Sequence, residues 1–167
     1  YSKHINSLHT YDYKVSEHRE LMDGSYNYDA IMDVQWPFGF GLSYTTFAYS
    51  DFVLESPAEF KAGDELKVSV KVTNTGDRAG KEAALVYSSD LVASLVPDVK
   101  RLRGFEKVAL EPGETKTVSF VIPAEELAFV GADGKWRLEE GDFRLSCGGL
   151  GLQVRCTETK VWETSNI

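Results

Sequence analysis

The stretch that decides the fold is Leu66-Lys67-Val68-Ser69-Val70-Lys71-Val72, in which apolar and polar side chains alternate without a break. Alternation with a period of two places the apolar side chains on one face of a half-buried β-strand. The turn-forming residues Asn74-Thr75-Gly76-Asp77 follow directly and end the strand. Residues 117–122 repeat the pattern. These two segments predict neighbouring strands of an antiparallel sheet.

The chain on either side of these segments continues as strands and turns. Glu111-Pro112-Gly113-Glu114 and Asp133-Gly134 are breaks at the spacing of an antiparallel sheet protein, and residues 123–127 predict a single helical turn. Seven or eight short strands without a long helix indicate an all-β, antiparallel sandwich of the immunoglobulin or fibronectin type III kind. Three further inward rows are expected: Ala83, Leu85 and Tyr87; Phe143, Leu145 and Cys147; Leu152, Val154 and Cys156.

The first 45 residues differ from the rest of the chain. They hold six of the eight tyrosines and all three histidines, with no sustained period of 2 or 3.6. An irregular segment of that length is unusual inside a compact domain, so its aromatic side chains are expected to pack on a partner surface. We therefore expect an aromatic-rich strap over residues 1–45 and a β-sandwich over residues 46–167.

Charge and hydropathy exclude two classes of partner. The net charge is −8, which repels nucleic acid, and no apolar run is long enough to predict a membrane span. Two cysteines, Cys147 and Cys156, are expected to stay unbridged, because a hairpin between them separates them by roughly 14 Å at about 3.4 Å per residue.

No arrangement of catalytic, metal-ligating or cofactor-binding residues emerges. His4, His9 and His18 lack the spacing of metal ligands. The pairs Glu125-Glu126 and Glu139-Glu140 are adjacent residues, which point to opposite faces of a strand. A calcium site built from loop carboxylates is a lesser alternative. The residues considered for it are expected at turns and strand ends: Asp51, Asp64, Asp77, Asp90 and Asp133.

The tryptophans raise the question of a sugar-stacking platform. Trp136 alternates with Leu138, which favours a place in the core. Trp36 and Trp162 are candidates for interface anchors, and neither makes a sugar site alone.

One segment is more specific than any of these. PFGFGLSYTTF, residues 37–47, resembles the signature near the C-terminal end of glycoside hydrolase family three. VTNTGDRAGKE (72–82), RLRGF (101–105), LEPGET (110–115) and GDFRL (141–145) are similar to successive strands and turns of that family's fibronectin type III-like domain. Tyr26-Asn27-Tyr28-Asp29 resembles the segment that leaves the α/β sandwich domain of β-glucosidase-like members.

The resemblance implies a retaining exo-acting glycosidase, a β-glucosidase or β-xylosidase, that works through two carboxylates about 5–5.5 Å apart. In the family these carboxylates belong to a barrel and an α/β sandwich domain, both upstream of residue 1, and no residue here matches either motif. The resemblance therefore implies a non-catalytic buttress without a cofactor, which meets oligosaccharide only through its parent enzyme. It also implies a periplasmic or secreted location.

The partners implied are the catalytic barrel and the α/β sandwich domain of the same parent. The residues expected to pack between domains are Tyr26, Tyr28, Trp36, Phe38, Phe40 and Tyr44. The alternatives are a carbohydrate- or protein-binding module and a generic adhesion-type sandwich. Exposed aromatics across one sheet face would favour a binding module, whereas an aromatic patch confined to the strap and one sheet edge would favour the buttress.

Overall fold

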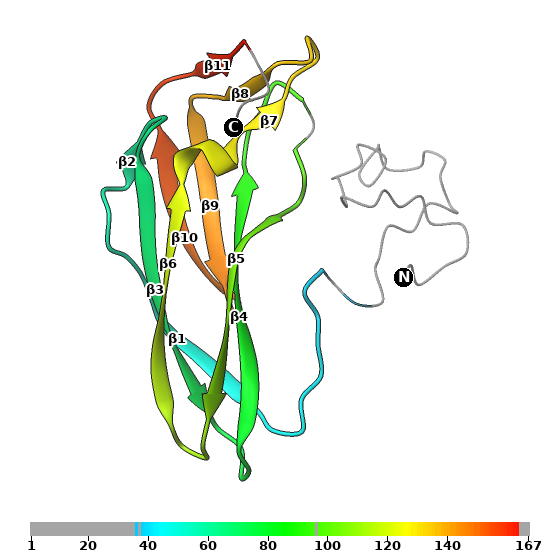
Figure 1. Cartoon of the computed structure of the whole chain (residues 1–167), viewed down its shortest axis with the longest axis vertical. Coiled ribbons are helices and arrows are strands. Elements are labelled where there is room, and N and C mark those ends of the chain that lie inside the picture. Colours follow the sequence, from blue (N-terminus) through cyan, green and yellow to red (C-terminus); the bar gives the residue numbers. More distant parts are fainter. Residues whose placement is uncertain (1–35, 37, 96, 164–167) are drawn as a thin grey trace, which may run out of the picture.

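A computed structural model describes residue 36, residues 38–95 and residues 97–163. Two sheets face each other in a sandwich, which confirms the predicted fold class (Figure 1). Their strands pair antiparallel, except for a short parallel pairing of residues 59–60 with residues 155–156. One sheet has the order β1-β3-β6, and the other has the order β2-β10-β9-β4-β5. Their strands are β1 (Phe47–Leu54), β2 (Glu59–Phe60), β3 (Glu65–Asn74), β4 (Gly80–Asp90), β5 (Arg101–Leu110), β6 (Thr115–Pro123), β9 (Gly141–Cys147) and β10 (Leu150–Cys156).

A small third sheet lies at one end of the sandwich (Figure 1). It has the order β11-β8-β7, made of β7 (Phe129–Val130), β8 (Trp136–Leu138) and β11 (Lys160–Trp162). The predicted Asp133-Gly134 turn joins β7 to β8, with Gly134 at a φ of 77°, a backbone conformation that suits glycine. The predicted helical turn is the 3-10 helix η2 (Ala124–Leu127), which follows Pro123.

The alternating rows of β3 and β6 form the centre of the core. Val68 lies opposite Phe120, and Val70 lies opposite Val118. Directly opposed residues share a face, so both rows point toward the second sheet. Seven residues expected in the core from their alternation are buried, as predicted: Val68, Val70, Val72, Val118, Phe120, Leu145 and Val154.

The end of β3 is held by a buried amide. Asn74 Oδ1 accepts hydrogen bonds from Gly76 N (3.0 Å) and Thr45 Oγ1 (2.9 Å), while its Nδ2 donates to the carbonyls of Arg78 (2.8 Å) and Leu110 (3.0 Å). A buried amide with all of these partners avoids the cost of an unsatisfied polar group. The turn predicted from Asn74 therefore connects β3 with β5 and with Thr45, just before β1.

The inward row predicted for β4 is wrong. Ala84 and Val86 are fully buried in the core, while Ala83, Leu85 and Tyr87 lie on the opposite face of the strand. Both faces of β4 are apolar, so a period of two does not by itself distinguish the core face. Tyr87 is nevertheless buried, because the chain before β1 covers it.

Asp51 was expected at a turn or strand end, and it lies inside β1 instead. The pairing of β1 with β3 shifts between Ser50 and Val53, and Asp51 adopts a φ of 50° at this bulge. Aspartate tolerates the left-handed region better than most residues, so it bends the strand here. Both cysteines are buried free thiols, as predicted. Trp136 is partly buried against the core.

Candidate interdomain surface

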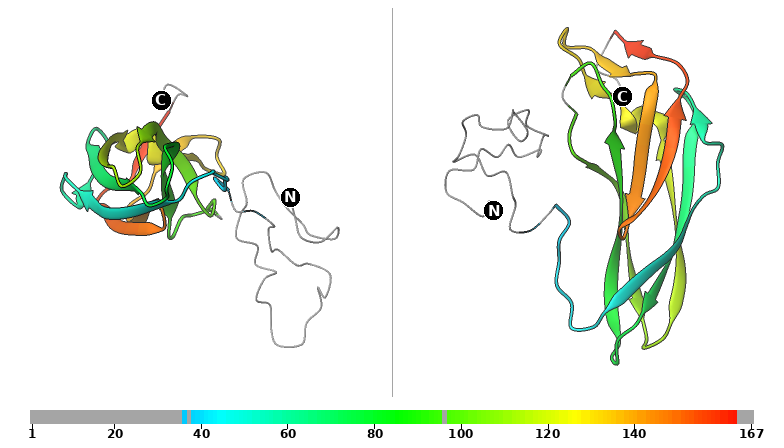
Figure 2. Two further views of the ribbon diagram at one scale, coloured as in Figure 1. Left: turned by 90° about the horizontal axis from the view of Figure 1, so that it is seen from below. Right: turned by 180° about the vertical axis from the view of Figure 1, so that it is seen from behind.

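The segment before β1 runs along the outside of the five-stranded sheet before it turns into β1 (Figure 2). The ring of Phe38 meets Tyr87 edge-on, with centroids 5.7 Å apart. Trp36 stacks on Phe40 at 6.4 Å. Three of the predicted interdomain residues therefore lie together, and one of them packs directly on the outward face of β4.

Gly39 makes this close approach possible. Its φ is 84°, and a Cβ at this position would overlap the hydroxyl of Tyr87 and lie 3.3 Å from Leu85 Cδ1. Any larger residue would therefore be strained in its backbone and would push the segment away from β4. Gly41, two residues later, has nothing within 4 Å of its hypothetical Cβ. The two glycines of the segment thus have different roles.

Lys100 adds a charge to the aromatic contact. Its Nζ lies 4.3 Å from the ring centroid of Tyr87 and 6.0 Å from that of Phe38. An ammonium group at such distances is attracted to the ring faces. Burial lowers the pKa of Lys100 and raises the pKa of Tyr87, because water is partly excluded around both groups.

A shallow cavity of about 250 Å³ is lined by Phe38, Phe40, Tyr49 and Glu82, among others. Tyr49 Oη donates a hydrogen bond to Glu82 Oε1 (2.8 Å), which joins the two sheets. Burial, followed by the bond to Glu82, raises the pKa of Tyr49 well above its usual range. Gly148 packs against the Tyr49 ring, where a Cβ would overlap the ring atoms.

The apolar surface extends from β4 to the edge strand β5. Phe105 lies opposite Leu85 and Leu102 lies opposite Tyr87, so these side chains share the outward face. Phe105 is 67% exposed, and Trp36, Phe38 and Phe40 are 46%, 55% and 51% exposed. We call this group the β4–β5 surface, defined by Trp36, Phe38, Phe40, Leu85, Tyr87, Leu102 and Phe105.

The remaining predicted packing residues do not join this group. Tyr44 is 96% exposed, and Tyr26 and Tyr28 lie outside the described residues. Sequence reasoning missed Leu85, Tyr87 and Phe105 as members of the surface. The available signal was the unbroken apolar run of residues 83–87, since a strand that is apolar at every position is covered on both faces.

The adjacent carboxylate pairs serve structural roles. Glu125 Oε1 accepts a hydrogen bond from Gly63 N (2.6 Å), and Glu139 binds Ser94 through its backbone N (2.8 Å) and Oγ (2.6 Å). Glu140 lies 3.4 Å from Arg155. Within the described part of the chain, no three His, Cys, Asp or Glu residues gather to hold a metal ion. The histidines considered as ligands lie outside that part.

No helix among the described residues has the length and apolar character needed to cross a membrane.

Comparison with known proteins identifies the domain. Residues 82–150 match the fibronectin type III-like domain family. A periplasmic β-glucosidase of Salmonella typhimurium is 46% identical over 72% of this chain and 16% of its own length. A putative β-xylosidase of Formosa agariphila is 42% identical over 73% of this chain and 16% of its own length.

Solved structures agree with these relatives. A β-glucosidase of Listeria innocua, crystallised with gluconolactone, superimposes with a TM-score of 0.73 at 33% identity, over 86% of this chain and 20% of the other. The chain thus spans about a sixth to a fifth of the length of these proteins, whose other parts have no counterpart in it. The chain therefore belongs to glycoside hydrolase family three, of whose members it represents the fibronectin type III-like domain.

Proposed function

We propose that this chain is the non-catalytic buttress of a retaining exo-β-glycosidase of the β-glucosidase or β-xylosidase type, and that its β4–β5 surface docks on the catalytic domains. The observation that carries the proposal is the apolar outward face of β4, which the segment before β1 covers only in part. Covering an aromatic side chain completely stabilises an interface by about 1.5–3 kcal/mol. Several half-exposed aromatics on one surface therefore favour a partner.

The distribution of aromatics favours the buttress over a binding module. The exposed rings belong to the segment before β1 and to Phe105 on β5, the edge strand of its sheet. Within the described residues these rings form no stripe across a sheet face, which a platform for a polysaccharide chain would require. The neighbouring ammonium group of Lys100 and the desolvated contact at Tyr87 suit a protein partner, since interfaces enrich aromatics and leave polar groups at their rims.

The two parts of the chain have different roles in this proposal. Residues 1–45 act as a strap between the sandwich and the α/β sandwich domain, and residues 46–167 act as the buttress. Trp36, Phe38 and Phe40 anchor the strap on β4, while the role of Tyr26, Tyr28 and Tyr44 is to pack on the missing domains. The periplasmic name of the Salmonella relative supports an extracytoplasmic location.

Catalysis belongs to the parent. Retaining glycosidases need two carboxylates about 5–5.5 Å apart, and this chain matches neither catalytic motif of the family. Purified alone, it is expected not to hydrolyse aryl β-glucosides or β-xylosides. Turnover that survives stringent purification and disappears on mutation of an acidic residue of this chain would contradict the proposal.

The docking role is tested in the full-length parent with two matched variants. Phe105→Asp places a charge on the β4–β5 surface, and Val121→Asp places the same charge on an edge strand of the other sheet. The two side chains are 67% and 55% exposed, so neither substitution disturbs the core directly. Phe105→Asp is expected to lower the unfolding temperature of the catalytic domains and their activity, because burying an unpaired charge at an interface is costly.

Val121→Asp is expected to leave the unfolding temperature and the activity of the catalytic domains unchanged. Equal effects of the two variants, or no effect of Phe105→Asp, would show that the catalytic domains do not dock on this surface.

A further inference from the structure

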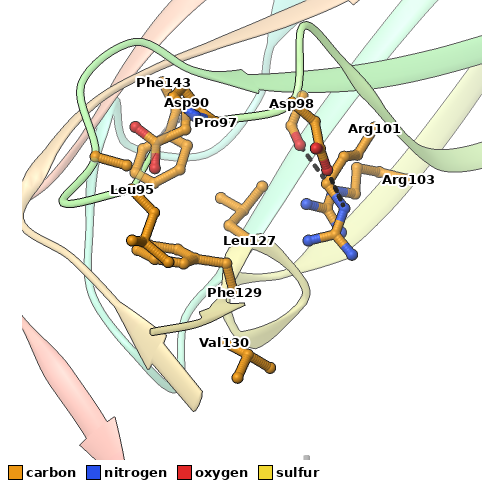
Figure 3. Close-up of a pocket in the computed structure, with 12 residues that line it drawn as sticks. Asp90, Leu95, Pro97, Asp98, Arg101, Arg103, Leu127, Phe129, Val130 and Phe143 are labelled. Carbon is orange, nitrogen blue, oxygen red and sulfur yellow. Dashed lines mark hydrogen bonds and ion pairs between the residues drawn. The ribbon is translucent and has the colours of Figure 1, made fainter. Parts of the chain in front are cut away.

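A second cavity, separate from the β4–β5 surface, lies at the end of the sandwich that carries the small sheet (Figure 3). Its volume is about 220 Å³. Residues from the C-terminal end of β4, the start of β5, the η2–β7 segment and Phe143 of β9 line it, together with Ala93, Leu95, Pro97 and Asp98 between β4 and β5. Figure 3 shows Arg101, Arg103 and Asp98 on one side, Asp90 on the other, and Leu127 between them.

Arg103 supplies hydrogen-bond donors. Its Nε donates to Ser88 Oγ at 2.7 Å, which orients the guanidinium. The Arg103 guanidinium lines the cavity beside Arg101 and Asp98 (Figure 3), and a guanidinium has five N–H donors, so it can donate to a ligand as well as to Ser88. Burial lowers the pKa of Arg103 to about 10, and the group stays charged at neutral pH.

Asp90 supplies an acceptor at the opposite side. Its Oδ1 accepts a hydrogen bond from Val92 N at 3.2 Å, which leaves capacity on the second carboxylate oxygen. Burial raises the pKa of Asp90 to about 6, against a partial lowering by the Val92 N–H. A carboxylate that has lost part of its hydration is stabilised by a hydrogen bond from a ligand hydroxyl, which replaces the bond to the lost water.

The surface between the two polar sides is apolar. Leu127 and Phe143 are 3% and 2% exposed, and Phe129 is half-buried beside them. Such a floor suits the C–H face of a ring whose edges carry hydroxyl groups. Arg101 lies 3.5 Å from Asp98 and thereby balances part of the charge on its side.

Charge and size narrow the ligand class. The two arginines disfavour a cation, and the two aspartates disfavour an anion. A neutral ligand that both accepts and donates hydrogen bonds fits the opposed groups. The volume lies below the roughly 300 Å³ at which pockets for drug-sized ligands begin, so the ligand is small.

We propose that this cavity binds a single pyranose ring, with Arg103 donating to one hydroxyl, Asp90 accepting from another, and the ring face lying on Leu127 and Phe129. The ring is either a free monosaccharide or the terminal residue of an oligosaccharide. This site is independent of the docking surface and performs no chemistry.

The test is titration of the 167-residue chain, followed by amide chemical shifts. The probes are methyl β-D-glucopyranoside, methyl β-D-xylopyranoside, xylotriose and, as an anion, sodium acetate. A glycoside is expected to shift the amides of Ser88, Asp90, Leu127 and Phe129 in a saturable manner at millimolar concentrations. Equal affinity for the monosaccharide and the trisaccharide indicates a free ring, and tighter binding of the trisaccharide indicates a chain end.

Variants at the two sides assign the contacts. Arg103→Met is expected to weaken binding at least tenfold, because a hydrogen bond to a charged group contributes about 1.5–3 kcal/mol. Asp90→Asn keeps the acceptor for Val92 N and is expected to weaken binding from the other side, so it tests the site even if Arg103→Met fails to fold. Arg78→Met, at an exposed arginine outside the cavity, is the matched control and should bind as the unmodified chain does.

Three results would overturn the proposal. One is the absence of saturable shifts up to the solubility limit of the glycosides. Another is a stronger response of the same amides to acetate. The third is a set of shifts confined to residues 36–40 and 85–87, which would place sugar on the β4–β5 surface instead.

Discussion

Strands β3 and β4 lie in opposite sheets and differ in their outward faces. The outward row of β3 is Lys67, Ser69 and Lys71, whereas the outward row of β4 is Ala83, Leu85 and Tyr87. Their inward rows both contribute to the core, through Leu66, Val68, Val70 and Val72 of β3 and through Ala84 and Val86 of β4. The outward face of β3 is thus polar, with Lys67 and Lys71 exposed and Ser69 buried, while the outward face of β4 is apolar.

The covering layer on β4 is incomplete. Gly39 and Phe38 pack against Tyr87 and exclude solvent from it. Phe105 on the neighbouring strand, in contrast, is 67% exposed. Protein interfaces combine aromatic side chains at the centre with polar groups at the rim, and this surface has the same composition. We therefore propose that the outward face of β4 docks on a partner domain, whereas the outward face of β3 stays in solvent.

The largest expected effect is a difference in stability between truncating a leucine on the inward face of β3 and truncating one on the outward face of β4. Leu66→Ala removes a fully buried side chain of β3 and is expected to lower the free energy of unfolding by about 2–5 kcal/mol. Leu85→Ala, on the outward face of β4, is expected to cost less than half as much in the isolated chain. Urea unfolding of both variants measures the difference. Equal losses would mean that the outward face of β4 is already part of the core.

The next effect concerns the junction between the two sheets. Gly148 and Gly149 both have positive φ, 56° and 86°, so alanine suffers similar backbone strain at either position. Only at Gly148 would the added Cβ overlap the ring of Tyr49, which binds Glu82 across the sheets. Gly148→Ala is expected to unfold about 1–3 kcal/mol more easily than Gly149→Ala. Identical stabilities by thermal unfolding would show that Tyr49 does not join the sheets.

The smallest expected effect is a pH dependence of stability, which arises from the residues at the ends of the two strands. β3 ends on Asn74, a neutral buried amide with its hydrogen bonds made, whereas β4 ends on Asp90, a half-buried carboxylate. Burial raises the pKa of Asp90 from 3.8 to about 6 in the folded protein. The folded state thus holds a proton more tightly than the unfolded state, and stability is lost as the pH rises from about 4 to about 6.

Asp90→Asn removes this proton uptake and keeps the acceptor for Val92 N. It is expected to stabilise the chain at pH 7 by about 1 kcal/mol or less, since solvent screens a half-exposed group. Its advantage should shrink as the pH falls toward 4. A variant less stable than the unmodified chain at pH 7, measured by thermal unfolding over this pH range, would contradict the assignment.

Strands β3 and β6 could be predicted from the sequence, whereas the core face of β4 could not. The rows of β3 and β6 are predictable, because charged or hydroxyl residues at every second position leave one possible core face. The row of β4 is not, because apolar residues occupy both parities and only tertiary contacts decide between them. Because of the same ambiguity, Tyr87 and Leu85 were not among the residues predicted to pack between domains.

The contact between the strap and the sheet could be predicted only in part. Trp36, Phe38 and Phe40 were identified by their composition and by the family resemblance, but their place on β4 depends on the positive φ of Gly39 and its fit to Tyr87. The bulge at Asp51 depends in the same way on a local backbone conformation that alternation does not encode. The pairing of β4 with β9, which completes the five-stranded sheet, joins residues far apart in the sequence.

Hydroxyl-radical footprinting of the side chains tests the docking claim most directly, with the isolated chain compared against the full-length parent. Phe105 on the β4–β5 surface and Val121 on the other sheet are both more than half exposed in this chain, so both should be oxidised when it is alone. The account predicts that Phe105, Phe38 and Trp36 lose most of their reactivity in the parent while Val121 keeps its own. Unchanged reactivity of Phe105, or protection of Val121 in its place, would contradict the claim that the outward face of β4 and β5 docks on the catalytic domains.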